Sequence, residues 1–258
     1  MSQSRILVLL VFLFTFAGTL SGLAALAEAQ TQGQQQQGNQ GTSLRGIPPA
    51  LAAAIQSGNS DAVAQAIATL SGGNPERAAG LAAAAIGAAE RLMATNPQAA
   101  INVADAAMQT VRAVAVMQGA PAQTLQVATI AARIMVQPEA QRVAPQQVAS
   151  LASAASAVVS NPTVYSASPT AALAVMTNAY ATGKSAVITA AVPNAAADVA
   201  AVLRTASQTT ALNQANPTNV ATIDTILKGT NPTTGRPLGD SGTPPVQGEN
   251  TGLQGSPT

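Results

Sequence analysis

Apolar side chains recur at helical spacing through most of the chain, and the segment that begins at Pro97 shows the pattern well. On a helix drawn from Pro97, two adjacent stripes are apolar and one narrow stripe is polar. The first apolar stripe contains Ile101, Ala104, Met108, Val111 and Ala115, and the second contains Val103, Ala107, Val114 and Met117. The polar stripe contains Gln98, Asn102, Asp105, Gln109 and Arg112. An apolar arc this wide predicts a helix with neighbours on two sides.

The next segment, which begins at Pro121, repeats this arrangement. Its apolar positions are Leu125, Val127, Ala128, Ile130, Ala131, Ala132, Ile134 and Met135, and the positions expected to face water are Gln126, Thr129, Arg133 and Gln137. No segment shows the apolar–polar alternation that predicts a strand. Alanine, which fills residues 82–85, has the highest helix propensity and lets helix axes approach closely. We therefore expect an all-α fold.

Prolines divide the helical pattern at regular intervals. Successive members of one series, Pro97, Pro121, Pro145, Pro169, Pro193 and Pro217, are 24 residues apart. Several prolines follow a capping residue, which predicts an N-cap with proline at the first helical position: Asn74-Pro75, Asn96-Pro97, Ser168-Pro169 and Asn216-Pro217. We expect an Ala-rich antiparallel helical repeat, solenoid-like or a bundle, with one helix of about 16 to 20 residues per unit. Breaks at Pro138, Asn161-Pro162 and Gly183 predict that some units divide into a helix and a shorter piece.

The N-terminal segment has the features of a secretory signal peptide. One positive charge precedes the apolar run 6–16, which is short for a bilayer span. Two small-x-small sites follow, so we expect cleavage after Ala27 or Ala29 and assign residues 1–29 to the signal peptide. An uncleaved anchor helix is the alternative. After cleavage we expect no stable membrane anchor and a periplasmic or secreted protein.

The two ends of the remaining chain differ in composition from its middle. Residues 30–46 are rich in Gln and Gly and are expected to form a flexible linker. Residues 229–258 are rich in Pro, Gly and Thr and are expected to form a disordered tail. The folded domain is then predicted to span residues 47–228, which is long enough for one core.

The composition excludes several common chemistries. The chain contains no Cys, no His and no Trp, so thiol and imidazole catalysis, disulfides and the usual zinc ligand sets are absent. Lys and Arg total 11 and Asp and Glu total 10, which leaves a net charge of +1 and no attraction for a polyanion. We expect no catalytic, cofactor-binding or metal-binding residues and no nucleic-acid partner.

The segment 181–185 ends in Gly183-Lys184-Ser185, as a phosphate-binding loop does. The loop pattern also needs a Gly five residues before Gly183, where this chain has Asn178, and it needs a preceding strand, where this chain is predicted to be helical. We interpret Gly183 as a residue that ends a helix, with Lys184 near the last carbonyl groups.

Other polar residues have structural interpretations. The carboxylates are dispersed along the chain, at Asp61, Glu76, Glu90, Asp105, Glu139, Asp198 and Asp224. Glu76, Glu139 and Asp198 are expected at helix starts, where the helix dipole favours them. The arginines could align as a weak basic ridge: Arg77, Arg91, Arg112, Arg133, Arg142 and Arg204. Tyr165 and Tyr180 are expected to cover the core with their hydroxyls in water.

Three functional hypotheses follow, from different classes. The first is a non-enzymatic structural or protein-binding helical-repeat protein of a bacterial envelope or extracellular matrix, which uses protein partners or self-association. Its contact surface would be the uncharged Gln, Asn and Thr stripe with the exposed parts of the Ala-rich faces. The second is a surface-active or ice-binding protein, which needs evenly spaced threonines, whereas Thr95, Thr110, Thr124 and Thr129 are unevenly spaced. The third is an exported hydrolase that lacks His and Cys.

Overall fold

The computed structural model describes residues 46–238, and within this range the chain forms helices and no strands. The predicted all-α class is therefore confirmed. The predicted signal peptide, the predicted linker up to residue 45 and residues 239–258 of the predicted tail lie outside the described residues. Between residues 46 and 238, no helix has both the length and the apolar character needed to cross a membrane.

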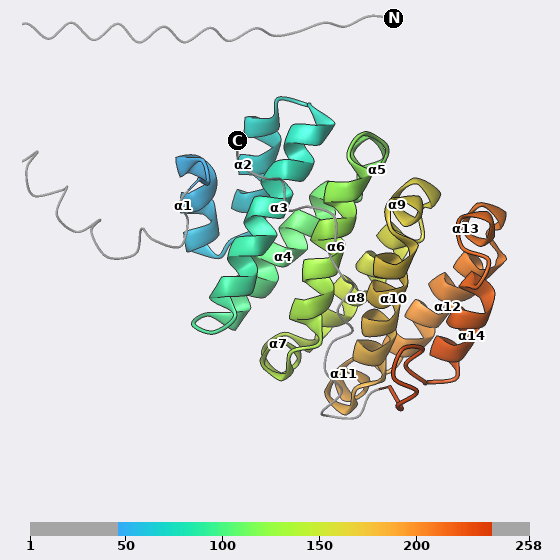
Figure 1. Ribbon diagram of the computed structural model, residues 1–258. Coiled ribbons are helices and arrows are strands. Elements are labelled where there is room, and N and C mark those ends of the chain that lie inside the picture. Colours follow the sequence, from blue (N-terminus) through green and yellow to red (C-terminus); the bar gives the residue numbers. More distant parts are fainter. Residues whose placement is uncertain (1–45, 239–258) are drawn as a thin grey trace, which may run out of the picture. The chain divides into compact units, whose positions relative to one another are not determined.

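Fourteen helices occupy the described range, nine of them longer and five of them six residues long (Figure 1). The longer helices are α1 (Pro49–Ser57), α2 (Ser60–Ser71), α3 (Pro75–Leu92), α4 (Pro97–Val111), α6 (Pro121–Met135), α8 (Pro145–Val159), α10 (Pro169–Lys184), α12 (Ala195–Gln208) and α14 (Asn219–Leu227). The six-residue helices are α5 (Val114–Gly119), α7 (Pro138–Val143), α9 (Pro162–Ala167), α11 (Ala186–Ala191) and α13 (Thr210–Ala215).

Proline begins most of the longer helices, as the sequence predicts. It is the first residue of α3, α4, α6, α8 and α10, where its missing N–H breaks no helical hydrogen bond. Three of the predicted N-caps are also present. The Asn74 and Asn96 side-chain oxygens accept from the N–H groups of Arg77 (2.8 Å) and Ala99 (3.1 Å), and Ser168 caps α10 in the same way.

The prediction that Asn216 caps a helix is wrong. Asn216 follows the last residue of α13, and α14 begins only at Asn219. The Asn216 side-chain oxygen instead accepts from the N–H (3.1 Å) and the hydroxyl (2.8 Å) of Thr218. Asparagine before proline therefore forms a local turn here rather than a helix start.

A short helix follows each longer helix from α4 to α12. The sequence predicted such division only in some units, and α4, α6, α8 and α12 are accordingly shorter than expected. Each short helix ends two residues before a proline of the 24-residue series, so one non-helical residue separates them. Ala120 and Ala144, for example, have φ of −140° and −143° with ψ of 56° and 63°, because the following proline ring disfavours the α conformation.

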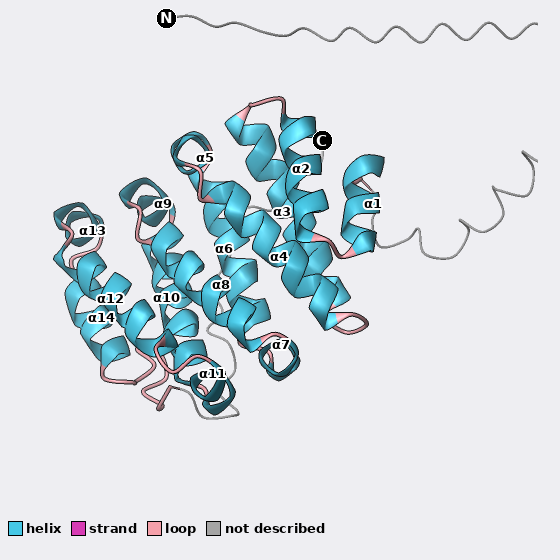
Figure 2. Cartoon of the chain, turned by 180° about the vertical axis from the view of Figure 1, so that it is seen from behind, coloured by secondary structure: helices cyan, strands magenta, loops and turns pink. Residues whose placement is uncertain are grey.

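The longer helices lie in two layers. One layer contains α3, α6, α10 and α14 and faces the viewer in Figure 1, and the other contains α2, α4, α8 and α12 and is in front in Figure 2. The short helices α5, α9 and α13 lie along one edge of the layers, and α7 and α11 lie along the opposite edge. Consecutive longer helices from α4 onward therefore run in opposite directions.

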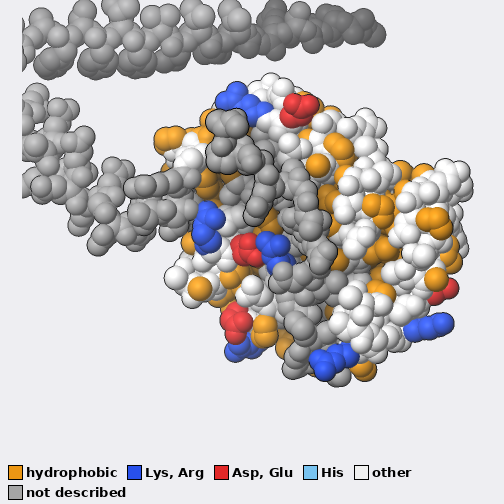
Figure 3. Space-filling view, viewed as in Figure 1, with side chains coloured by type: hydrophobic (Ala, Val, Ile, Leu, Met, Phe, Trp, Pro, Cys, Tyr) orange, Lys and Arg blue, Asp and Glu red, His pale blue; other side chains and the backbone are white. Residues whose placement is uncertain are grey.

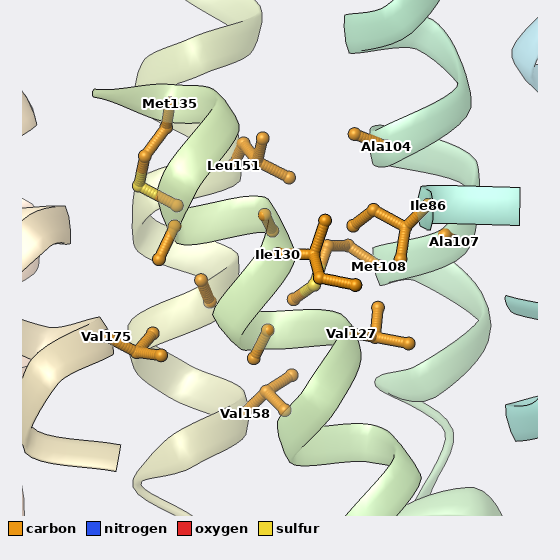
Figure 4. Close-up of a cluster of buried hydrophobic side chains, with 14 of the residues drawn as sticks. Ile86, Ala104, Ala107, Met108, Val127, Ile130, Met135, Leu151, Val158 and Val175 are labelled. Atoms are coloured by element: carbon orange, nitrogen blue, oxygen red, sulfur yellow. The ribbon is translucent and has the colours of Figure 1, made fainter. Parts of the chain in front are cut away.

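The core lies between the two layers and is built from aliphatic residues and many alanines. Figure 4 shows Ile86 of α3, Met108 of α4 and Ile130 of α6 meeting in one cluster, and all three are buried. Both predicted apolar stripes of α6 are buried along their whole length. In α4 the predicted core positions up to Val111 are likewise buried.

Two residues predicted for the core from the Pro97 pattern are exposed. Val114 has 62% of its surface exposed, and Ala115 is also exposed. Because α4 ends at Val111, the chain turns before these residues and the helical register no longer applies to them. Thr129, which was expected to face water, is buried, and its hydroxyl donates to the carbonyl of Leu125 at 2.8 Å.

Residues 229–238 continue the ordered chain beyond the helices. Thr230 and Pro237 form an isolated antiparallel bridge, and the Leu238 N–H donates to the Gly229 carbonyl at 2.7 Å. The Leu238 side chain is buried and packs with the main core. The first ten residues of the predicted tail thus form a folded loop.

Candidate functional site

Three amide side chains form a hydrogen-bonded group on the surface of the layer that contains α4 and α8. We call Gln98, Asn102 and Gln147 the amide cluster. The Gln98 amide nitrogen donates to the side-chain oxygens of Asn102 (3.0 Å) and Gln147 (2.8 Å). The Gln147 amide nitrogen donates to the same Asn102 oxygen at 3.1 Å. The cluster thus fixes three amides from two helices that are not consecutive in sequence.

Asn102 also ties the amide cluster to a turn near the start of the domain. Its amide nitrogen donates to the carbonyl of Gly58 at 2.8 Å, in the turn between α1 and α2. A Cβ atom added at Gly58 would lie 2.7 Å from the Cβ of Ala99, so the turn approaches α4 closely because residue 58 has no side chain. Gln98 and Gln147 remain exposed, while Asn102 is half-buried.

The amide cluster has the chemistry of a neutral recognition surface. Each amide carries two donor hydrogens and an acceptor oxygen with two lone pairs, so the cluster's internal bonds leave donors and acceptors directed to solvent. Asp105 and Gln109, one and two turns further along α4, extend the polar surface, and their side chains are joined by a 2.8 Å hydrogen bond. The polar stripe of α4 predicted from the sequence is therefore at the surface.

The carboxylates are dispersed, as their positions in the sequence indicate. Glu76, Glu139 and Asp198 lie in the first turns of α3, α7 and α12, as predicted. Within residues 46–238, no three carboxylates are grouped in a way that could hold a metal ion. Two carboxylates in this range form ion pairs with arginine, Glu90 with Arg133 and Glu139 with Arg142.

The ion pair between Glu90 of α3 and Arg133 of α6 links adjacent helices of one layer. The Arg133 Nε and Nη2 atoms donate to the two oxygens of Glu90 at 2.7 and 3.0 Å, which is bidentate geometry. The hydrogen bond to Glu90 raises the pKa of Arg133, while partial burial acts in the opposite direction. Arg133 is therefore held by α3 and does not face water freely.

The remaining basic residues do not form a ridge on the face shown in Figure 3. There the Lys and Arg side chains lie apart from one another, and several are next to Asp or Glu. Electrostatic capture of a polyanion depends on clustered positive charge, which this face lacks.

The segment that resembles part of a phosphate-binding loop is helical. Gly183 and Lys184 are the last two residues of α10, and Ser185 caps α11 by accepting from the Ile188 N–H at 3.3 Å. Lys184 Nζ lies 5.9 Å from the centre of the Tyr180 ring, a cation–π distance. Phosphate binding of this kind needs an open loop, and these residues form the end of one helix and the cap of the next instead.

The interpretation of Gly183 as a helix-ending residue needs a correction. Gly183 is the penultimate residue of α10 and lacks the positive φ of a glycine that ends a helix, and its missing side chain allows close packing. A Cβ atom added there would lie 3.0 Å from the backbone N and Cα of Ala196, in the first turn of α12. Close helix packing was predicted from the alanines, but the position at which glycine is needed depends on the tertiary fold.

The expectation for Tyr165 is also wrong. Tyr165 is fully buried, and its hydroxyl donates to the side-chain oxygen of Asn219 at 2.8 Å. The Asn219 amide nitrogen in turn donates to the Asn213 side-chain oxygen at 2.7 Å. Burial raises the pKa of the Tyr165 hydroxyl, and the hydrogen bond with Asn216 opposes this effect. These residues hold α9, α13 and α14 together.

Tyr180 is half-buried, and its hydroxyl donates to the carbonyl of Leu227 at 3.3 Å.

Two of the threonines considered for an ice-binding face, Thr124 and Thr129, are buried. These two threonines therefore cannot belong to an exposed threonine array.

Comparison with known proteins finds no relative of this chain. The chain matches no known family model, no curated protein and no solved structure.

Proposed function

We propose that the chain is an exported, non-enzymatic helical-repeat protein of a bacterial envelope or extracellular matrix that binds protein partners or associates with itself. The amide cluster carries this proposal, because it presents fixed neutral donors and acceptors without a reactive group. The export part rests on the predicted signal peptide 1–29.

The helix positions support a repeat of 24 residues. The five short helices begin at Val114, Pro138, Pro162, Ala186 and Thr210, each 24 residues after the one before. The longer helices α4, α6, α8 and α10 also begin at this spacing, and α12 begins two residues later than it would require. A unit of one longer and one short helix accounts for these positions.

A shared hydrogen bond supports the same repeat. The fourth residue of α7, α11 and α13 has a polar side chain that donates to the carbonyl six residues earlier, near the end of the preceding longer helix. The bonds are Gln141 to Met135 (3.0 Å), Thr189 to Gly183 (3.3 Å) and Asn213 to Ser207 (2.9 Å). Each bond satisfies a carbonyl that the helix end leaves without a helical partner.

Repetition favours protein recognition because successive units present similar surfaces side by side. Gln98 lies in the first turn of α4, and Gln147 lies in the first turn of α8, two units further along the chain. Their amides meet because alternate longer helices are neighbours in the same layer. A partner that lies across this layer would contact the exposed amides of both helices.

Replacing the exposed amides tests the proposal. The Gln98→Ala/Gln147→Ala double variant removes two members of the cluster and retains Asn102, which holds the Gly58 turn. The control is Gln208→Ala/Gln214→Ala, which removes two exposed glutamines of α12 and α13. Each immobilised protein would be incubated with envelope and medium fractions of the source cells, and the captured proteins would be identified by mass spectrometry.

We expect the original protein and the control to retain the same specific partner, and the cluster variant to lose it. Circular dichroism would confirm equal helix content in all three. Equal capture by the two double variants would place the binding surface elsewhere. Turnover of a peptide, ester or glycan substrate, abolished by one Ser, Lys or carboxylate substitution, would replace this proposal with a hydrolase.

A further inference from the structure

One side of α10 reaches solvent at both ends of the helix but is buried in between. Residues three or four positions apart share one side of a helix. On this side of α10 they are Thr170, Leu173, Ala174, Thr177, Ala181 and Lys184, and we call this set the α10 outer stripe. Thr170 and Lys184 are exposed. Between them, Leu173, Ala174 and Thr177 are only 8%, 6% and 1% exposed.

The described helices do not account for this burial. α10 packs against α8 and α12 of the opposite layer and against α6 and α14 beside it. Figure 1 views this layer from outside, and no helix of residues 46–238 lies in front of the middle of α10. The corresponding side of α8, in the opposite layer, is exposed at Ser150 and Ala157. A further segment must therefore cover the α10 outer stripe.

The covered surface continues onto α6. Thr129 lies on one side of α6 with the exposed Ala122 and the half-buried Arg133, yet Thr129 itself is buried. The hydroxyls of Thr129 and Thr177 each donate to the carbonyl four residues earlier, in both cases at 2.8 Å. Because each hydroxyl hydrogen already has an acceptor, both threonines can be covered by a segment without charge.

The described chain ends beside one end of the α10 outer stripe. The Leu238 N–H donates to the Gly229 carbonyl at 2.7 Å. A Cβ atom added at Gly229 would lie 2.6 Å from Nζ of Lys184, the last residue of α10. The chain that follows Leu238 therefore starts near the C-terminal end of α10.

The geometry points to residues 239–258 as the segment that covers the α10 outer stripe, so that α10 and α6 form a binding surface for a peptide of the same chain. The 16 residues of α10 form a rod about 24 Å long. Residues 239–258 span up to about 66 Å when extended. They can follow the stripe and also reach α6, because neighbouring helix axes are about 8–10 Å apart.

Charge favours this occupant. The only charged residues in 239–258 are Asp240 and Glu249, and both are acidic. The only charged residue of the α10 outer stripe is Lys184, and neither ion pair of the described residues includes it. Asp240 follows Leu238 by two residues, which places its carboxylate within reach of Lys184.

The composition of 239–258 suits an extended bound peptide. Pro244 and Pro245 favour the extended polyproline II conformation, so this part loses little entropy when it binds. A tethered segment has an effective concentration on the order of 1 mM, so an affinity of about 0.1 mM keeps the surface covered for about nine-tenths of the time. The inference thus departs from the disordered tail that composition alone predicts.

This inference goes beyond the proposed function and is independent of it. The amide cluster lies on the layer of α4 and α8, whereas the α10 outer stripe lies on the opposite layer (Figures 1 and 2). Loss of partner capture in the Gln98→Ala/Gln147→Ala variant would leave the stripe covered.

Thiol labelling tests the inference, because the chain has no cysteine and an introduced one is unique. The full chain with Ala174→Cys, in the form the cell produces, would be compared with the same variant in which residues 239–258 are exchanged for a Gly/Ser segment of equal length. The maleimide reaction should be about tenfold slower with the natural segment. Ala157→Cys, at an exposed position of α8, is the matched control and should react equally fast with both segments.

The other outcomes overturn the inference. Slow labelling of Ala174→Cys with both segments would mean that the helices themselves cover the stripe. Fast labelling with both would mean that the stripe is open. Protection that increases with protein concentration would assign the cover to a second copy of the chain.

A charge variant repeats the test if the exchanged segment impairs folding, which circular dichroism would reveal. Asp240→Lys in the Ala174→Cys chain places like charges beside Lys184, so the labelling rate should rise by about threefold. An unchanged or lower rate overturns the inference.

Discussion

The hydroxyl of Tyr165 donates a 2.8 Å hydrogen bond to the side-chain oxygen of Asn219, which lies 54 residues further along the chain. Both side chains are fully buried. Asn219 also donates to Asn213, which in turn donates to the carbonyl of Ser207. A connected polar network of this kind orients the short helices α9 and α13 against α14, because each buried polar group is satisfied in one arrangement.

We predict that Tyr165→Phe destabilises the fold by about 1–3 kcal/mol, because it leaves the buried Asn219 oxygen without its donor. Urea unfolding followed by circular dichroism measures the change. Tyr180→Phe is the control. Tyr180 is half-buried and makes a longer hydrogen bond of 3.3 Å to Leu227, so this variant should lose less stability. A double-mutant cycle of Tyr165→Phe with Asn219→Ala should show strong coupling. Additive effects would contradict the network.

Alkaline pH should destabilise the protein through Tyr165. Its pKa is raised in the folded state, so the folded protein holds this proton more tightly than the unfolded chain does. The contribution of the Tyr165 hydroxyl to stability is complete below the pKa of about 10 that tyrosine has in the unfolded chain, and it is lost as pH rises towards the folded pKa. Urea midpoints at pH 8 to 11 should fall more steeply for the original protein than for Tyr165→Phe. Parallel curves would refute the prediction.

Much of the helical architecture could be predicted because its signals are local. Proline at a helix start and the capping of α3 and α4 by Asn74 and Asn96 depend on neighbouring residues alone. The short helices were only partly predicted. Pro138 and Pro162 reveal α7 and α9, whereas α5 begins at Val114 without a proline or a side-chain cap. Continuing one helical register past Val111 therefore placed Val114 in the core by mistake.

The candidate site could be predicted only in part, since it depends on contacts between distant segments. Gln98 and Asn102 were identified as part of a polar stripe. Gln147 lies 49 residues from Gln98 and reaches them only because α4 and α8 are neighbours in the same layer. The burial of Tyr165 likewise depends on Asn219, which no local pattern connects to it. Composition excluded imidazole and thiol chemistry, and it gave no position for a binding surface.

Core truncation should distinguish buried from exposed apolar residues. Ile101 and Leu125 are buried, so replacing either by alanine should destabilise the fold by about 2–5 kcal/mol. Val114 is 62% exposed, and Val114→Ala should change stability by less than about 0.5 kcal/mol. Chemical unfolding of the three variants gives the comparison. A large loss for Val114→Ala would mean that α5 packs differently from the arrangement described above.

The ion pair between Glu90 and Arg133 should contribute little despite its bidentate geometry. Both side chains keep about a third of their surface exposed, at 34% and 31%, so solvent screens the attraction. We expect Glu90→Gln to destabilise by less than about 1 kcal/mol at low salt and by less still at 1 M salt. Unfolding at two salt concentrations, at protein concentrations too low for self-association, measures both values. A loss that salt does not reduce would indicate packing rather than charge.

Glycine substitutions should have opposite effects at two helical positions. Gly183→Val places side-chain atoms against the backbone of α12, where even a Cβ lies 3.0 Å from Ala196, so we expect destabilisation of about 1–3 kcal/mol. Gly87→Ala adds a methyl group in open space and improves helix propensity, so we expect stabilisation of about 0.5–1 kcal/mol in dilute solution. Thermal unfolding of both variants tests the pair. Both residues are helical and neither has a positive φ, so helix propensity alone would predict a gain in stability when either glycine is replaced. The close approach of α10 and α12 turns this gain into a loss at Gly183.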